Sequence, residues 1–463
     1  MERSINTIEN INFEEELIKN VLEIITFFSV VLYDSRSNKN KKNNRRFEKN
    51  SEMNISHKIE IKPNNKSISY FKKAFGCARF AYNWGLAKWK EAHEKGEKKT
   101  HLDLKKEFNS LKDKEFPFVY EVSKYVTQQP FINLGKAFKK FFKDLKNKKI
   151  SYPQFKRKKD NEGSFYIGGD QVKVNGKYLG IPLLKNKIKM TEELRFKGKI
   201  NSVTISYDGN KYFASFQLEI DNNEYKKTRK VKYNGLAVGG DIGVKAFLTL
   251  SNGLQILFPK EKIKKQEKKI IKLQRQLSKK VHPKTKGDKT NKSNNYIKHS
   301  KKLNKAYKKL KNIKNDFLHK LTTVLINNFQ YIAVEKLNVS GLLKNHKLAK
   351  SIQELSFFEF RRQLEYKALF NKREIVKADT FYPSSKTCSR CGKKKDLTLS
   401  DRVYECECGL TIDRDYNASI NLLNLIKDKV REVLPEFTSV DLTALLDDLS
   451  LNCLATSKVE AEI

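Results

Sequence analysis

Three carboxylates stand at the ends of predicted elements in the second half of the sequence. Asp241 closes an apolar strand, Glu335 closes another, and Asp415 lies just before a predicted helix. A charge at a strand end persists in a folded core only if it is paired or bound to a cation. Clustered carboxylates bind hard cations such as Mg²⁺ or Mn²⁺, and two such ions can activate water and stabilise the leaving oxygen of a phosphodiester. One acid at a strand end, taken by itself, is more often a cap or part of a surface ion pair. The three acids together favour metal-dependent nuclease chemistry.

The third acid has a competitor. The run Asp413-Arg-Asp415-Tyr-Asn417 offers two carboxylates two residues apart, and spacing alone does not choose between them. Asn417 is a residue type that caps helices, so the helix is expected to begin there and a neighbouring acid to be structural.

A second group is made of cysteines. Four of the six cysteines lie within 21 positions and can close a tetrahedral zinc site, and a glycine follows each pair where the chain must turn. The expected ligands are Cys388, Cys391, Cys406 and Cys408. The second pair is one residue tighter than the usual Cys-x-x-Cys, and free thiols or another metal are the alternatives. Since the nearest upstream histidine is His346, no open catalytic position is expected and the zinc should be structural.

The composition points to a polyanionic partner. The 463 residues carry 95 Lys+Arg and 53 Asp+Glu, a net charge of +42, while 38% hydrophobic residues still allow packed cores. Such a surplus favours a nucleic-acid partner, because each lysine or arginine side chain that contacts a phosphate releases counterions. A lysine-rich composition from AT-biased coding is the alternative. The sequence contains no run of 18 apolar residues, so we expect neither a membrane-spanning helix nor a membrane partner.

Sequence periodicity predicts the strands and helices of the first half of the chain. Residues 1–52 are expected to be a poorly ordered leader, and Met53 could be the true start. Residues 57–62 alternate as a strand, residues 67–92 have helical spacing, and a second helical block runs from about 119 to 145. Strands at 203–207 and 212–218 form a hairpin. We therefore expect a small β domain at 53–66 and 160–233, with a helical insert at 67–159.

The second half predicts a mixed α/β sheet. We expect three consecutive strands at 236–241, 246–250 and 254–258, followed by a lysine-rich helical hairpin within 260–328. The basic side chains of the hairpin either line a nucleic-acid channel or face solvent. The remaining elements are a strand at 331–335, a helix at 351–370, a strand at 374–378, the cysteine segment 383–410 and a helix from Asn417. This α/β unit is expected at 234–382 and 411–430, followed by a tail at 431–463.

Candidate nucleic-acid contacts lie in the first half, where aromatic, basic and amide side chains mix. Such mixtures suit base stacking and phosphate contact, although helical spacing makes core packing the stronger alternative for Tyr82. The candidates are Arg79, Tyr82, Asn83, Tyr125, Gln128, Gln129, Lys156 and Arg157. No phosphate-binding glycine loop and no Gly-x-Ser-x-Gly is present, so an NTP-driven motor and a serine hydrolase have no support.

Five motifs together resemble the TnpB (OrfB) family, insertion-sequence proteins long called transposases. They span about residues 55 to 425 in the family's order: Phe75-Gly-Cys-Ala-Arg-Phe-Ala-Tyr-Asn-Trp84, Gly239-Gly-Asp-Ile-Gly-Val-Lys245, Val334-Glu-Lys-Leu-Asn-Val339, Pro383-Ser-Ser-Lys-Thr-Cys-Ser-Arg-Cys-Gly392 and Asp413-Arg-Asp-Tyr-Asn-Ala-Ser-Ile-Asn421. The leader and the tight second cysteine pair depart from the family's commonest form.

The resemblance implies an RNA-guided DNA endonuclease related to type V CRISPR effectors. Its fold would be an RNase H-like RuvC nuclease with an inserted zinc ribbon, preceded by a wedge-like β domain whose helical insert holds the guide and reads a short motif beside the target. The family's Mg²⁺-binding or Mn²⁺-binding catalytic acids fall on Asp241, Glu335 and Asp415, and not on Asp413.

The resemblance also implies partners and a location. Guide RNA from the element's flank would pair with double-stranded DNA, so that the protein recognises backbone and shape. The location would be the bacterial cytoplasm, close to the nucleoid. The alternatives are an RNA-guided repressor that does not cut, a transposase acting directly on element ends, and a plain zinc-ribbon nucleic-acid binder.

Overall fold

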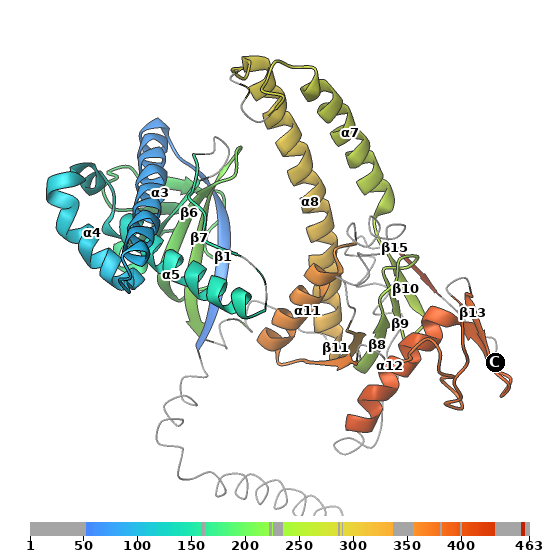
Figure 1. Ribbon diagram of the computed structural model, residues 1–463. Coiled ribbons are helices and arrows are strands. Elements are labelled where there is room, and N and C mark those ends of the chain that lie inside the picture. Colours follow the sequence, from blue (N-terminus) through green and yellow to red (C-terminus); the bar gives the residue numbers. More distant parts are fainter. Residues whose placement is uncertain are drawn as a thin grey trace, which may run out of the picture. The chain divides into compact units, whose positions relative to one another are not determined.

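The computed structural model describes residues 52–147, 149, 151–158, 163–221, 225, 235–285, 288, 290–336, 355–379, 382–398, 401–430 and 455–458. The chain divides into two compact units, and Figure 1 shows their elements. Unit 1 takes Met1–Lys159, Gly163–Ser206 and Tyr212–Thr228, and unit 2 takes the remainder. The predicted leader lies outside the described residues except for Glu52, and most of the predicted tail does too.

Unit 1 is built on a seven-stranded sheet with strand order β2-β6-β7-β1-β5-β4-β3. The predicted first strand is confirmed and is longer than expected, because β1 (Glu52–Lys62) pairs with β7 from Glu52↔Asp221 to Ile61↔Tyr212. Met53 lies within this pairing, opposite Ile220. The other strands are β2 (Gly163–Gly168), β3 (Lys173–Asn175), β4 (Tyr178–Gly180), β5 (Ile188–Met190), β6 (Lys199–Tyr207) and β7 (Tyr212–Asp221).

Helices α3 (Asn65–Glu94), α4 (His101–Glu115) and α5 (Lys124–Lys146) fall between β1 and β2, as a helical insert does. The first predicted helix is confirmed. Helix α4 was not predicted, and the second block begins at Lys124 and not near Val119, because Pro117–Glu121 forms a 3-10 turn and Ser123 caps α5. An aromatic core packs the three helices together, including Trp84, Phe108 and Phe131.

Unit 2 contains a six-stranded sheet with strand order β12-β11-β8-β9-β10-β15. The antiparallel meander and the following parallel strands agree with the expected RNase H-like α/β fold, which is thus confirmed. The strands are β8 (Gly235–Asp241), β9 (Leu248–Leu250), β10 (Leu254–Leu257), β11 (Phe329–Glu335), β12 (Glu374–Ala378) and β15 (Ala455–Lys458). Strand β15 comes from the predicted tail, so this part of the tail belongs to the sheet.

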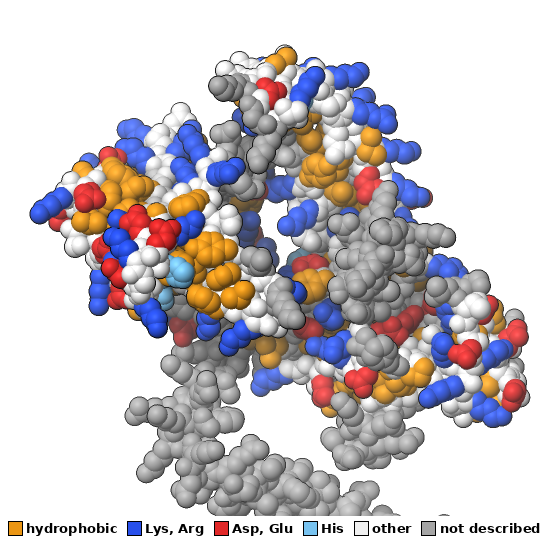
Figure 2. Space-filling model, in the orientation of Figure 1, with side chains coloured by type: hydrophobic (Ala, Val, Ile, Leu, Met, Phe, Trp, Pro, Cys, Tyr) orange, Lys and Arg blue, Asp and Glu red, His pale blue; other side chains and the backbone are white. Residues whose placement is uncertain are grey.

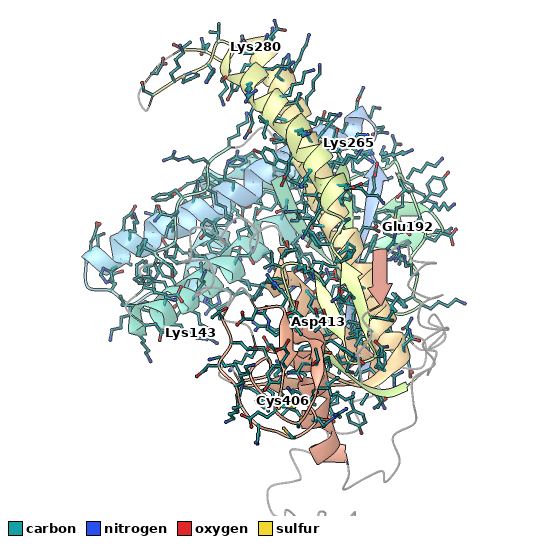
Figure 3. All side chains as sticks on the ribbon, turned by 90° about the vertical axis from the view of Figure 1, so that its right-hand side faces the viewer. Lys143, Glu192, Lys265, Lys280, Cys406 and Asp413 are labelled. Atoms are coloured by element: carbon teal, nitrogen blue, oxygen red, sulfur yellow. The ribbon has the colours of Figure 1, made fainter. Side chains whose placement is uncertain are left out.

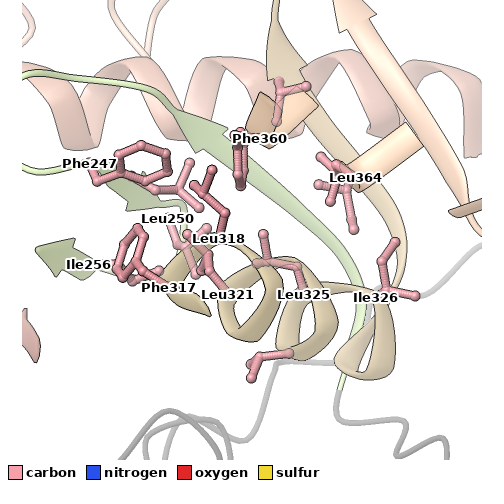
Figure 4. Packing of buried hydrophobic residues seen from close by; sticks show 14 of the residues in the cluster. Phe247, Leu250, Ile256, Phe317, Leu318, Leu321, Leu325, Ile326, Phe360 and Leu364 are labelled. Atoms are coloured by element: carbon pink, nitrogen blue, oxygen red, sulfur yellow. The ribbon is translucent and has the colours of Figure 1, made fainter. Parts of the chain in front are cut away.

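Helices cover both faces of this sheet. Neighbouring residues on one strand point to opposite faces, so the helix that each residue contacts shows which face that helix covers. Val238 and Val334 join a large core with α8 (Asn294–Asn328) and α11 (Phe357–Asn371). Phe247, Phe317 and Phe360 meet within this core (Figure 4). Ala237 and Ala333 instead pack with Leu422 and Ile426 of α12 (Arg414–Val430). The sheet therefore has α8 and α11 on one face and α12 on the other.

The lysine-rich hairpin consists of α7 (Lys260–Ser278) and the first part of α8, which confirms both predicted helices. A buried amide joins them, since the Gln266 side chain donates to the Ala306 carbonyl at 2.8 Å. Figure 2 shows lysine and arginine side chains along the hairpin, with hydrophobic and uncharged side chains between them, and Lys265 and Lys280 mark the hairpin in Figure 3. Within the described helices, none is long and apolar enough to span a membrane.

Candidate acidic metal site and cysteine cluster

Parallel pairing of β8 with β11 sets two of the three predicted acids at one edge of the unit 2 sheet. The register places Val334 opposite Gly240, and the next residues along the two strands are Glu335 and Asp241. Because both strands run in the same direction, their last side chains lie at the same sheet edge. Each acid is half-buried. The predicted proximity of these two carboxylates is thus a consequence of register.

Helix α12 supplies the third acid, and its first turn separates Asp413 from Asp415. The helix begins at Arg414, so the expected start at Asn417 is wrong. One carboxylate oxygen of Asp413, which Figure 3 labels, accepts hydrogen bonds from the backbone N–H groups of Asp415 and Tyr416, each at 3.0 Å. Asp413 therefore caps the helix. Asp415 lies in the first turn, and its negative charge acts on both Asp241 and Glu335, whereas the charge of Asp413 acts on Asp241 more weakly.

A glycine allows α12 to lie directly against β8. A Cβ atom on Gly239 would stand 2.0 Å from the Ser419 carbonyl oxygen and 2.5 Å from the Leu423 nitrogen, both of the helix backbone. Gly243 is also close to the site, since a Cβ there would lie 3.9 Å from the Asp415 carboxylate. No side chain fits between strand and helix at Gly239, and this close approach brings Asp415 to the sheet edge.

The electrostatics of the three acids favour a bound cation. Burial and the nearby charges of Glu335 and Asp415 raise the pKa of Asp241 well above its usual range. Burial likewise raises the pKa of Glu335, although the Ser384 hydroxyl donates a hydrogen bond to it. Arg414 lies 3.4 Å from Asp415 and partly offsets the negative charge. Carboxylate oxygens are the ligands that Mg²⁺ and Mn²⁺ prefer, and a bound cation would offset the repulsion between them, so this set of donors suits such ions.

The cysteine cluster is more compact than the acidic site. All four predicted sulfur atoms lie within 4.8 Å of one another, and no acids of the described segments form so tight a group of three. The Sγ atoms of Cys388 and Cys408 are 3.6 Å apart, and those of Cys391 and Cys406 are 3.5 Å apart. Zinc–sulfur bonds of about 2.3 Å give a tetrahedral edge of about 3.8 Å. The cysteines thus fit zinc, and the tighter second pair still closes the site.

The surroundings of the cluster affect its thiols differently. Burial opposes ionisation of Cys388, but hydrogen bonds from the backbone N–H groups of Cys391 and Arg390 and from the thiols of Cys406 and Cys391 together outweigh it, and the pKa of Cys388 falls to about 7. The pKa of Cys406 is instead raised, because the backbone hydrogen bond from Cys408 is outweighed by burial and by hydrogen bonds to Cys391 and Cys388. Gly392 and Gly409 adopt positive φ angles of 76° and 84°, which confirms the predicted turns. Strand β13 (Val403–Glu405) pairs with β14 (Thr411–Asp413), so the ribbon extends beyond the predicted end at 410.

Two asparagines that sequence analysis did not assign to this role attach the ribbon to α12. Asn417 is fully buried, accepts a hydrogen bond from the Ser389 N–H at 3.0 Å and donates to the Thr387 carbonyl at 2.7 Å. Asn421, one turn later, donates to the carbonyls of Thr387 at 2.6 Å and Ser384 at 2.8 Å. Their spacing of four residues on a helix was the available signal, because it puts both amides on one face.

The predicted nucleic-acid residues of unit 1 differ in their contacts and exposure. Lys156 lies with its ammonium 4.1 Å from the centre of the buried Tyr82 ring, and Asn83 exchanges two hydrogen bonds with the Lys156 backbone. Tyr125, on α5, lies against Tyr166 with ring centres 6.1 Å apart. Arg79, Gln128 and Gln129 are half-buried, and Arg157 is exposed. No nucleic-acid contact is tested by this placement, so these assignments stay predictions.

The fold and the two groups of side chains define a class of protein. It has an RNase H-like α/β unit with a candidate acidic site and an attached cysteine ribbon, and this unit follows a β unit with a helical insert. The family model "Probable transposase" matches residues 215–346, and "Cas12f1-like, TNB domain" matches 357–422. The model "Helix-turn-helix domain" matches 53–98, a range that here folds as strand β1 and helix α3.

Similar proteins identify the family. A Streptomyces pristinaespiralis protein named "Putative RNA-guided DNA endonuclease" is 31% identical over 375 residues, covering 79% of this chain and 88% of that protein. A "TnpB-like protein" of Acanthamoeba polyphaga mimivirus is 30% identical over 259 residues, covering 53% of this chain and 46% of the other. The chain belongs to the TnpB family, as its motifs predicted. The "Cas12f1-sgRNA-target DNA complex" is a similar solved structure, with 13% identity, a TM-score of 0.49 and coverage of 81% and 99% of the two chains.

Proposed function

We propose that this protein is an RNA-guided, divalent-cation-dependent DNA endonuclease. The observation that carries the proposal is the meeting of Asp241, Glu335 and Asp415 at one edge of the unit 2 sheet. Family membership supports the substrate, because relatives bear the name RNA-guided DNA endonuclease. The guide would come from the flank of the transposable element, and the protein would act in the bacterial cytoplasm beside the nucleoid.

The chain's own residues would divide the work as follows. Asp241, Glu335 and Asp415 hold Mg²⁺ or Mn²⁺, which when bound supplies Lewis-acid activation of the phosphodiester and of water. Arg414 restrains Asp415 from one side, since its guanidinium also donates to the Thr398 carbonyl at 3.4 Å. The four cysteines hold a structural zinc, which fixes the ribbon without taking part in cleavage.

In this proposal, exposed lysine side chains contact the phosphates. Helix α7 presents Lys262, Lys264, Lys265, Lys268, Lys269 and Lys272 to solvent, and α8 presents Lys301, Lys302, Lys305 and Lys309. A row of such charges binds an RNA or DNA backbone without reading its sequence, and binding should weaken steeply with salt. The assignments of Arg79, Tyr82, Asn83, Tyr125, Gln128, Gln129, Lys156 and Arg157 to guide and target contact belong to the same proposal.

The test is to co-express the full-length chain with its flanking DNA, sequence the RNA that copurifies, and assay Mg²⁺-dependent cutting of matching DNA beside randomised flanks. Cutting only of DNA that matches the bound RNA supports the proposal and gives the adjacent motif. Bound RNA without cutting would favour a silent repressor. Cutting that needs no RNA would favour a transposase acting on element ends.

A further inference from the structure

One hydrogen bond joins the two sites of unit 2. The Ser384 hydroxyl donates to a carboxylate oxygen of Glu335, and the serine lies four residues before Cys388. Ser384 is buried, at 2% exposure, so this bond has little competition from water. A hydrogen bond to one oxygen of a carboxylate fixes its rotation and leaves the other oxygen available to a cation.

The segment that carries Ser384 is itself held by buried side chains of α12. Asn421 donates to the Ser384 carbonyl, and Asn421 and Asn417 both donate to the Thr387 carbonyl. Asn417 also accepts from the N–H of Ser389, the residue after the first cysteine ligand. Both asparagines are buried, with 0% and 3% exposure. The segment from 384 to 389 is thus attached to the helix that carries Asp415.

This arrangement has a mechanical consequence. The segment 384–389 ends in the first cysteine knuckle, where the Cys388 N–H donates to the Lys393 carbonyl at 2.9 Å. A bound zinc would hold the four sulfur atoms, which lie 3.5 Å and 3.6 Å apart in two pairs, in one cluster, and its loss would free the first knuckle from the second cysteine pair. A knuckle that opens would pull on the segment and move the Ser384 hydroxyl relative to Glu335.

We propose that Ser384 is a positioning residue that orients Glu335 in the acidic site and couples that site to zinc occupancy of the cysteine cluster. The inference rests on the proposed function in one respect, which is that the three acids bind a divalent cation. It adds a residue that touches neither zinc nor the reacting atoms and that acts through Glu335.

The first test measures Mn²⁺ binding to the full-length protein by electron paramagnetic resonance, together with zinc content and melting temperature. Loss of a hydrogen-bond partner behind a metal ligand costs roughly 10-fold to 100-fold in metal affinity, so Ser384→Ala should raise the Kd for Mn²⁺ by about 10-fold or more. Ser385→Ala, in the same turn, is the matched control and should leave the Kd unchanged. Equal Mn²⁺ affinity of Ser384→Ala and the wild type overturns the inference.

A double-mutant cycle separates positioning from a general loss of stability. In a Glu335→Gln background, Ser384→Ala should change the Kd for Mn²⁺ less than it does in the wild type, because the group it orients has changed. Ser384→Thr, which retains the hydroxyl, should recover most of the affinity. If Ser384→Ala costs the same in both backgrounds, the serine acts through the fold and the inference fails.

The last test addresses the coupling. Removal of zinc by a chelator should weaken Mn²⁺ binding in the wild type, and Mn²⁺ should slow zinc loss by the reciprocal coupling. In Ser384→Ala the effect of zinc on Mn²⁺ binding should be smaller, and an unchanged effect overturns the path through Ser384. A wild type whose Mn²⁺ binding does not depend on Asp241 overturns the proposed function and with it the inference, whereas normal binding without coupling overturns the inference alone.

Discussion

The cysteine cluster and the acidic site are assembled in opposite ways. Four thiol ligands come from within 21 residues, on two turns whose geometry is local. The three acids come from positions 241, 335 and 415, and they come together only because two parallel strands share a register and a helix packs against both of them. The first site is therefore a property of a short segment, and the second is a property of the whole unit.

The comparison predicts that substitution of an acid has the largest effect on DNA cutting. Asp241→Ala should lower guided DNA cutting at least about 1,000-fold, since cation activation is worth several kcal/mol, while DNA binding stays unchanged. Cleavage and gel-shift assays on the same preparation measure both. Asp396→Ala, at an acid of the ribbon with 97% of its side chain exposed, is the control and should cut normally. Parallel loss of binding and cutting would contradict the assignment of Asp241.

The cysteine cluster should behave as a structural centre. Cys391→Ser should reduce zinc content and lower the free energy of unfolding of unit 2 by about 3 kcal/mol or more, because structural zinc binding is coupled to folding. Elemental analysis and thermal unfolding provide the measurements. Cys77→Ser, at a buried cysteine of α3 outside the cluster, should keep the zinc. A Cys391→Ser protein with full zinc would contradict the four-cysteine site.

The acidic site should depend on the approach of α12 to β8. Gly239→Ala places a methyl group against the helix backbone and should cost about 1–3 kcal/mol of stability and reduce cutting, with zinc content unchanged. Gly76→Ala is the control, since nothing lies within 4 Å of the added carbon and alanine is the better helix former. Normal stability and activity of Gly239→Ala would mean that the helix can move without cost.

The smallest effect separates the two neighbouring aspartates. Asp413→Ala removes the cap of α12 and should cost about 1 kcal/mol of stability, and Asp413→Ser should retain most of it because serine also caps. Both should still cut DNA, whereas Asp415→Asn should not. Chemical denaturation and the cleavage assay measure the two outcomes. Loss of cutting in Asp413→Ser would assign the third catalytic position to Asp413.

Much of the fold follows from the sequence because its elements carry their own signals. Alternating apolar residues predicted β1, a short apolar run predicted β8, and the long lysine-rich runs predicted α7 and α8. The missed helix α4 has only Leu104 and Phe108 as fully buried apolar residues, a weak periodic signal. Strand β15 could not be predicted from its own residues, since its conformation depends on pairing with β10.

The sites divide in the same way. Cysteine spacing predicts the cluster, but spacing left Asp413 and Asp415 equivalent, because only the folded helix shows that Asp413 caps it and that the charge of Asp415 acts on both other acids. Asn417 was expected to be a cap by residue type, yet it lies inside the helix and binds the ribbon. The role of Ser384 depends on a contact with Glu335 across 49 residues, which no local pattern encodes.

Strand β15 has a consequence for how the protein can be shortened. Its four residues pair with Leu254–Leu257 and occupy the outer edge of β10. A chain truncated before Ala455 would leave the backbone donors and acceptors of that edge unpaired, and such edges recruit strands from other molecules. Trimmed versions of the protein should therefore self-associate on storage, even though all three acids and all four cysteines are retained.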